Sequence, residues 1–190
     1  MTQYARPDAD QAVGSWTTAP LWSKVDDDIS GGGTGDDVKI ASDAVGNGSS
    51  TTNADLGLSI LSDPVTDTGH ILTVRWNNGG EGGSGRNIIG HCELWEGVPG
   101  TGTLRAEVAA PTLLGADTTE VATTHTLTSG EADAITNYGD LFIRLWGSGS
   151  GPGPSRSLQV EAVQFEVPDA AVSGWSTEHF KPRENVLLRR

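Results

Sequence analysis

The chain has 190 residues, with 25 acidic side chains against 12 basic ones and a formal net charge of −13. Because neutralising phosphate groups requires clustered lysine and arginine, this charge argues against nucleic acid as a partner, and equally against an anionic membrane surface. The length suits one globular domain with extensions, and 26 glycines indicate many tight turns. The single cysteine, Cys92, leaves no internal disulfide and no cysteine-based metal cage, and its strand-like surroundings predict a buried thiol.

The first 60 residues are rich in loops and contain only short predicted elements. Trp16 lies in a strand-like piece, and residues 20–28 predict a turn followed by a single helical turn. Residues 38–41 resemble a strand, and residues 54–61 form a clearer one. The N-terminus lacks the basic and apolar pattern of a signal peptide, and no apolar run approaches the length of a membrane span. We therefore expect synthesis in the cytoplasm without signal-directed export.

Between residues 70 and 168, short apolar stretches alternate with glycine-rich turns. Several short strands at regular spacing predict an all-β protein, specifically an antiparallel β-sandwich. Within these strands, apolar residues recur at every second position, as expected where one face of a sheet is buried. The residues predicted to face the core in this way are Leu72, Val74, Trp76, Ile88, Cys92, Leu94, Leu141, Ile143 and Leu145.

Glycines and a change of phase mark irregular points in these strands. Gly90 interrupts an apolar strand and predicts a bulge or a close approach of another group. The last strand changes its buried face near Ala162, which predicts a β-bulge there. The glycine-rich residues 77–85 are interpreted as a hairpin tip rather than a phosphate-binding loop, because neither a GK[ST] motif nor a helix follows.

One short helix is predicted within the β-rich region. Thr128 and Glu131 match the capping-box pattern S/T-x-x-E. The helical stretch that follows is brief, because Asn137 and Gly139 end it. The sequence thus predicts one or two helical turns that connect two strands.

Six segments of the chain, taken in order, resemble a known group of proteins. They read ARPDADQAVGSWTT, LWSKVDDD, GHILTVRW, ELWEG, LTSGEADAITNYGDLFIRL and VEAVQFEVP. This order of parts resembles the jelly-roll-type structural proteins of tailed bacteriophages, over roughly residues 5–168. The resemblance implies a non-enzymatic virion protein assembled in the bacterial cytoplasm, above all a capsid decoration or cement protein that stabilises the head. Its implied partners are the major capsid protein and copies of itself, for which a trimer is one arrangement.

The chain continues beyond the resemblance. Residues 1–169 are predicted to form the β-sandwich domain, and residues 170–190 an extended C-terminal arm. The arm holds four basic residues against two acidic ones, whereas the rest of the chain holds eight against twenty-three. We expect the arm to dock on a neighbouring subunit; packing on its own domain and a frayed terminus are the alternatives. The candidate partner-binding residues are Trp175, Phe180, Val186, Leu187, Leu188, Arg189 and Arg190.

No catalytic or metal-binding signature is present in the sequence. The histidines, at positions 70, 91, 125 and 179, lack the spacing of a metal site. Aspartates 26–28 and 36–37 flank a glycine-rich loop and could supply oxygen ligands to Ca²⁺, but their spacing does not match an EF-hand. No serine lies in a G-x-S-x-G context, and no pair of carboxylates is singled out for glycoside hydrolysis. We therefore expect no enzyme and no cofactor.

Two alternatives to a capsid role remain open. A low-copy neck or tail protein would have the same sequence features. A carbohydrate- or receptor-binding module on the tail or a head fibre would need exposed aromatic rings on which a sugar stacks. Candidate platforms, each with a competing place in the core, are Trp22, Trp76, Trp95 and Trp146. Trp95 is the one most expected to be exposed, because it is out of phase with Cys92 and Leu94.

Overall fold

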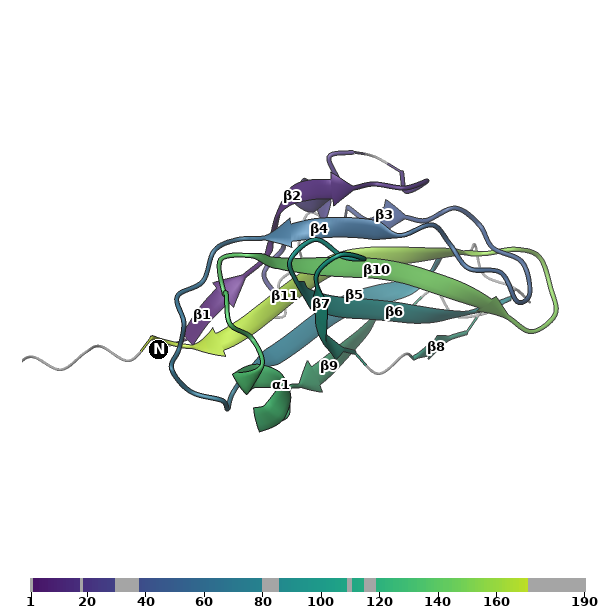
Figure 1. Cartoon of the computed structure of the whole chain (residues 1–190). Helices are drawn as coiled ribbons and strands as arrows, with labels where there is room; N and C mark the ends of the chain where they lie inside the picture. The colour runs from purple at the N-terminus through teal and green to yellow at the C-terminus, as the bar shows by residue number, and fades with distance from the viewer. Residues whose placement is uncertain are drawn as a thin grey trace, which may run out of the picture.

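Two antiparallel β-sheets pack face to face in a computed structural model of the chain (Figure 1). The structure describes residues 2–17, 19–29, 38–79, 86–108, 111–114 and 119–170. Successive strands alternate repeatedly between the two sheets, which is typical of a jelly-roll arrangement. The predicted all-β, jelly-roll-like antiparallel β-sandwich is confirmed.

The smaller sheet contains five strands and the larger sheet six. In the five-stranded sheet the order is β1 (Thr2–Ala5), β11 (Ser157–Pro168), β5 (Ile71–Gly79) and β9 (Val121–Thr126), with β3 (Ile40–Ala41) also paired to β11. In the six-stranded sheet the order is β2 (Pro7–Ala12), β4 (Ala54–Leu58), β10 (Leu141–Ser150), β6 (Asn87–Glu96) and β7 (Thr103–Glu107), with β8 (Thr112–Leu113) also paired to β6. A 3₁₀ turn, η1 (Trp22–Lys24), and a five-residue helix, α1 (Ser129–Asp133), complete the described elements.

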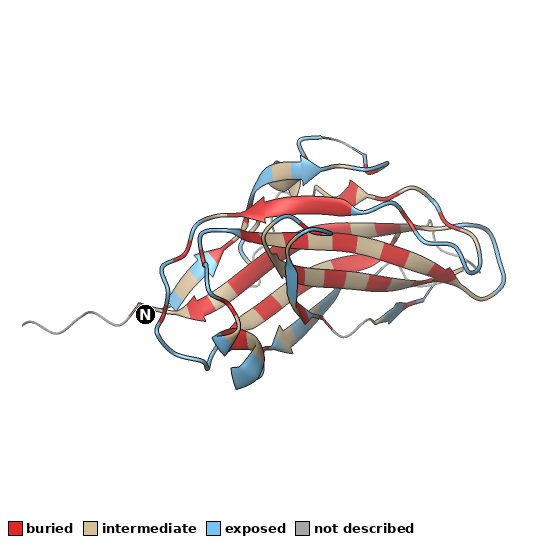
Figure 2. Ribbon diagram, viewed as in Figure 1, coloured by how far each residue is buried: buried red, intermediate tan, exposed pale blue. Residues whose placement is uncertain are grey.

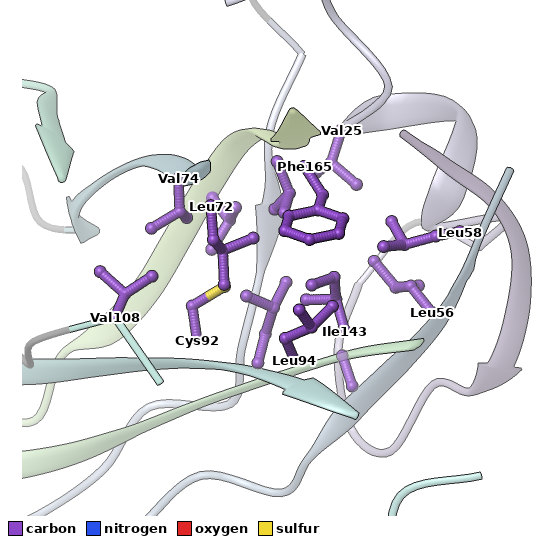
Figure 3. Close-up of a cluster of buried hydrophobic side chains, with 14 of the residues drawn as sticks. Val25, Leu56, Leu58, Leu72, Val74, Cys92, Leu94, Val108, Ile143 and Phe165 are labelled. Atoms are coloured by element: carbon purple, nitrogen blue, oxygen red, sulfur yellow. The ribbon is translucent and has the colours of Figure 1, made fainter. Parts of the chain in front are cut away.

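The core lies between the two sheets and follows the alternation predicted from the sequence. Along β6 and β10, buried and half-buried residues alternate (Figure 2). Leu72, Val74 and Phe165 from one sheet face Leu94 and Ile143 from the other (Figure 3). All nine residues predicted to face the core are buried, and the Cys92 thiol is among them. Burial raises the pKa of this thiol far above its usual range, so it is unreactive.

Both irregular points expected in the strands are present. Gly90 is a close approach rather than a bulge: a Cβ atom there would lie 3.0 Å from the ring of the buried Trp76. In β11, Val160 pairs with Trp76 and Ala162 pairs with Arg75, so Glu161 is the extra residue of a β-bulge. The bulge keeps apolar residues on the core side in both halves of the strand.

The helix α1 begins with the predicted capping box. The Thr128 hydroxyl accepts a hydrogen bond from the Glu131 backbone N–H, and the Glu131 carboxylate accepts one from the Thr128 backbone N–H. Shortly after the helix, the Tyr138 hydroxyl lies 2.7 Å from His70 Nε2 in the core. Burial raises the pKa of Tyr138 to about 12 and lowers that of His70.

The N-terminal segment differs from the expectation. Its strands are β1 and β2, neither of which was predicted, whereas Trp16 is buried without belonging to a strand. The β2 sequence PDADQA is polar and mostly exposed, since β2 forms an edge of its sheet, and so it lacks the apolar alternation of an internal strand. The Asp10 carboxylate accepts hydrogen bonds from the backbone N–H groups of Leu21 and Trp22, at 2.9 and 2.8 Å, and thereby anchors the expected helical turn, η1.

Parts of the sequence predictions fall outside the described residues. These parts are residues 80–85 of the glycine-rich connection and residues 171–190, which hold every candidate partner-binding residue of the C-terminal arm. None of the described helices is long and apolar enough to cross a membrane.

Candidate functional site

Six outward-facing residues of β6 and β10 form three cross-strand pairs on the outer face of the six-stranded sheet. The pairs are Phe142 with Trp95, Arg144 with Glu93, and Trp146 with His91, and together they are termed the aromatic ladder. All six residues are half-buried, whereas the residues between them are buried (Figure 2). Since β6 and β10 pair over ten consecutive residues without a register shift, the ladder rests on the most regular part of the sheet.

Glu93 lies at the centre of the ladder and holds both tryptophans. Its Oε2 accepts a hydrogen bond from Trp95 Nε1 at 2.7 Å, and its Oε1 accepts one from Trp146 Nε1 at 2.8 Å. Each indole N–H is a single donor, so these bonds fix the orientation of both rings. Glu93 is therefore a positioning residue for the two aromatic groups.

One end of the ladder is a stacked pair of rings. The His91 and Trp146 rings are parallel, with centroids 3.6 Å apart. His91 Nδ1 lies 2.7 Å from Oε1 of Glu107 on the neighbouring strand β7. The stacking and the contact between His91 and Glu107 restrict the rotation of both rings. Side chains that are already restricted lose less conformational entropy when a ligand binds.

Arg144 ties the ladder to β4. Its Nε and Nη2 donate to the two carboxylate oxygens of the buried Asp55, at 2.7 and 2.8 Å, and Nη2 also donates to the Pro99 carbonyl at 3.1 Å. The hydrogen bond with Asp55 raises the pKa of Arg144. The guanidinium carbon lies 5.4 Å from the centroid of the Trp95 ring, within the range of a cation–π contact.

The structure separates the four candidate tryptophan platforms. Trp76 is fully buried, and its Nε1 donates to the Thr123 hydroxyl, so it belongs to the core. Trp22 is half-buried in η1, outside the ladder. Trp95 and Trp146, also half-buried, lie together in the ladder.

Sequence reasoning did not find the group that surrounds Trp95 and Trp146. His91, Glu93 and Arg144 were visible as outward residues of alternating strands, but not as neighbours. Alternation assigns a side chain to a face, whereas the pairing register decides which side chains meet. Once β6 and β10 are known to pair, their alternation places the outward residues of the two strands opposite one another, and this identifies the ladder.

Each of the described histidines has one ring nitrogen within hydrogen-bonding distance of a neighbouring side chain. Besides His70 and His91, His125 lies 3.2 Å from the Glu131 carboxylate. Among the described residues, no group of three or more His, Cys, Asp or Glu side chains is placed to hold a metal ion. Two of the aspartates considered for Ca²⁺, Asp36 and Asp37, lie outside the described ranges. The fourth histidine, His179, also lies outside them.

A second group of charges lies on the five-stranded sheet, at the bulge of β11. Arg75 Nη2 lies 3.0 Å from Glu120 and 3.4 Å from the buried Glu161, and Lys39 forms an ion pair with Glu120. Burial raises the pKa of Glu161 to about 7, and the hydrogen bond between the two carboxyl groups adds to that rise. The same hydrogen bond, together with Lys39 and Arg75, lowers the pKa of Glu120. The two acids therefore share a proton more readily than two isolated carboxylates would.

A cavity of about 440 Å³ lies between the connection preceding β5 and the region of α1. Its lining includes Asp63, Asp67, Asp133 and Tyr138. Val65, at its rim, has a positive φ of 56° and is largely exposed. The cavity shares no lining residue with the aromatic ladder.

No protein-family model and no curated protein sequence matches this chain. Among solved structures, the chain is similar to a xylan-binding module CBM15, with 15% sequence identity and a TM-score of 0.41. The likeness covers 90% of this chain and 99% of that chain. A likeness at this level does not indicate a ligand.

Proposed function

We propose that this chain is a non-catalytic binding module and that the aromatic ladder recognises a saccharide. The observation that carries the proposal is the pair of half-buried indoles, Trp95 and Trp146, both held by Glu93 on the outer face of a regular sheet. Sugar rings present C–H faces that pack on aromatic rings, while their hydroxyls bond to polar groups at the ring edges. The ladder places two aromatic rings beside polar side chains on one face of the sheet.

The fixed orientation of Trp95 and Trp146 is better explained by binding of a ligand than by packing within the domain. A buried or half-buried tryptophan needs only one hydrogen-bond acceptor, which a backbone carbonyl or water readily supplies. Here one carboxyl group serves two indoles, and histidine and arginine contact the same two rings. Rings fixed before the ligand arrives lose less conformational entropy on binding.

The first test screens the full-length protein against immobilised neutral and acidic oligosaccharides and then measures affinity by titration calorimetry. We expect Trp146→Ala and Trp95→Ala each to weaken binding by at least about tenfold, equivalent to about 1.4 kcal/mol. Trp22→Ala is the matched control, because Trp22 is also half-buried but lies outside the ladder. A protein that binds no saccharide, or ladder variants that bind like the control, would refute the proposal.

We also propose a place for the chain in a bacteriophage virion, either as a decoration or cement protein of the capsid or as a low-copy component of the neck or tail. The resemblance across residues 5–168 supports this proposal. Two of its most specific pieces have structural roles: Asp10 of the RPDAD segment anchors η1, and Tyr138 of the NYGD segment bonds to His70. The resemblance thus concerns residues that build the fold, and it is compatible with a recognition face on the outer sheet.

Copy number tests the virion proposal. Quantitative mass spectrometry of purified particles against the major capsid protein should give hundreds of copies for a decoration protein and a handful for a neck, tail or fibre component. Deleting residues 170–190 should leave a folded domain that no longer enters particles, if the arm docks on a neighbouring subunit. Absence of the protein from particles would overturn the virion proposal without affecting saccharide binding.

A further inference from the structure

The cavity beside α1 combines an apolar floor with an acidic rim. The buried residues of its lining are Ala132, Ile135 and Tyr138. The exposed residues of its lining include three aspartates, Asp63, Asp67 and Asp133. No lysine or arginine is among the described residues that line it. Such a cavity suits a lysine or arginine side chain, because the aliphatic stem packs on apolar surface while the charged group stays at the rim.

The main chain leaves the sandwich beside this cavity. β11 ends at Pro168, and the side-chain amide of Gln3 donates to the carbonyl oxygens of both Pro168 and Ser62, each at 3.0 Å. At the other end of the connection before β5, a Cβ atom on Gly69 would lie 3.1 Å from Pro168 Cγ. The part of this connection that lines the cavity, within residues 63–67, is therefore flanked on both sides by contacts with the end of β11 (Figure 1).

The chain that continues from this point carries the charge that the cavity lacks. Residues 171–190 hold four basic side chains against two acidic ones, whereas the rest of the chain holds eight against twenty-three. Phe180, Lys181 and Arg183 lie together in the sequence FKPR. Lys181 is thirteen residues beyond Pro168, and that length of extended chain reaches up to about 43 Å. The length of the arm therefore does not prevent contact with a cavity that borders Pro168.

From the charges and the exit point together, we propose that the C-terminal arm docks in this cavity of its own domain through Lys181 and Arg183. The proposal takes the alternative in which the arm packs on its own domain, and it is independent of the saccharide and virion proposals. Exposed ion pairs are individually weak, but a tethered segment has an effective concentration in the millimolar range, so weak contacts suffice. The second basic pair, Arg189 and Arg190, is farther along the chain and has a lower effective concentration.

Paramagnetic relaxation in the full-length protein tests the docking. A spin label is attached to the cysteine of Ser176→Cys, because the native thiol, Cys92, is buried and unreactive. We expect the label to broaden the amide signals of Thr66 and Ile135, on the two sides of the cavity. The amide of Gly151, in the turn before β11 and thus at the opposite end of that strand from the arm, should stay sharp.

Charge variants show whether the cavity attracts the arm. Asp133→Lys should reduce the broadening of the cavity amides at least about twofold, and raising the ionic strength should act in the same direction. Adding Lys181→Glu and Arg183→Glu to Asp133→Lys should restore the broadening, because the attraction is then rebuilt with the signs exchanged. Asp8→Lys is the matched control, since Asp8 is exposed on β2, outside the cavity, and the change in net charge is the same.

A mixture of two kinds of chain identifies which domain receives the arm. One kind carries the isotope label without the spin label, and the other carries the spin label without the isotope. Sharp cavity signals in this mixture, with broadened signals in the doubly labelled chain, support docking within one chain. Broadening in the mixture would overturn the proposal and place the arm on a neighbouring subunit. Broadening that Asp133→Lys leaves unchanged, or that is confined to the residues around Pro168, would also overturn it, and neither result bears on saccharide binding.

Discussion

Gly90 offers a direct test of how tightly the two sheets pack. A Cβ atom at this position of β6 would lie 3.0 Å from both Cε3 and Cζ3 of Trp76 and 3.3 Å from Cη2. The Trp76 indole is fully buried, and its Nε1 donates to the Thr123 hydroxyl at 3.0 Å. The ring therefore cannot move away without breaking that hydrogen bond or disturbing its neighbours in the core.

The expected cost of Gly90→Ala follows from two opposing effects. Forcing an extra methyl group into a well-packed core costs about 1 to 3 kcal/mol. Replacing glycine by alanine in a strand restricts the unfolded chain and returns about 0.5 to 1 kcal/mol. We expect a net loss of up to about 2.5 kcal/mol in the free energy of unfolding. Each kcal/mol lost lowers the melting temperature by about 2 to 4 °C in a domain of this size.

The measurement is urea unfolding of the variant followed by tryptophan fluorescence, with circular dichroism as a second probe. Gly57→Ala in β4 is the matched control, since its Cβ would lie 3.5 Å from the Ala9 Cβ, an ordinary contact. We expect the control to be neutral or stabilised by up to about 1 kcal/mol. If Gly90→Ala proves as stable as Gly57→Ala, the indole has room to move and the reasoning fails.

Three further predictions concern the core, the helix and the buried acids. Phe165→Ala should destabilise the domain by about 3 to 5 kcal/mol in chemical denaturation, because Phe165 is fully buried between the sheets; a loss below 1 kcal/mol would contradict its place there. Thr128→Ala should cost about 1 kcal/mol, because it removes the cap of α1, whereas Thr128→Ser should retain most of that stability. Glu161 has a pKa of about 7 in the folded protein against 4.5 as its ordinary value, so the folded state binds more protons than the unfolded state over that interval. The contribution of Glu161 to stability should therefore be fully present below about pH 4.5 and be lost as pH rises through 7. Glu161→Gln should flatten this part of the profile of stability against pH, and should gain stability relative to the wild type at pH 8. An unchanged profile would show that Glu161 does not titrate in this interval.

The strands, the helix and the bulge could be predicted because each depends on neighbours in the sequence. Alternation along β6 and β10 indicates which face of each strand is buried. Thr128 and Glu131, three residues apart, indicate where the helix begins. The bulge at Glu161 was visible as a change of phase near Ala162. The strands β1 and β2 were missed because edge strands bury little and their polar sequences carry no alternation.

The sequence by itself determined the β-sandwich class, the residues of the core and the outward direction of Trp95 and Trp146. Tertiary structure alone decided that these two rings share Glu93, that His91 stacks on Trp146, and that Arg144 is bonded to Asp55, 89 positions away in the chain. The physical reason is that burial follows a local period of two residues, whereas contact across strands depends on a register that pairs distant segments. A surface assembled from three strands is therefore defined by the pairing of those strands and cannot be found in any one of them.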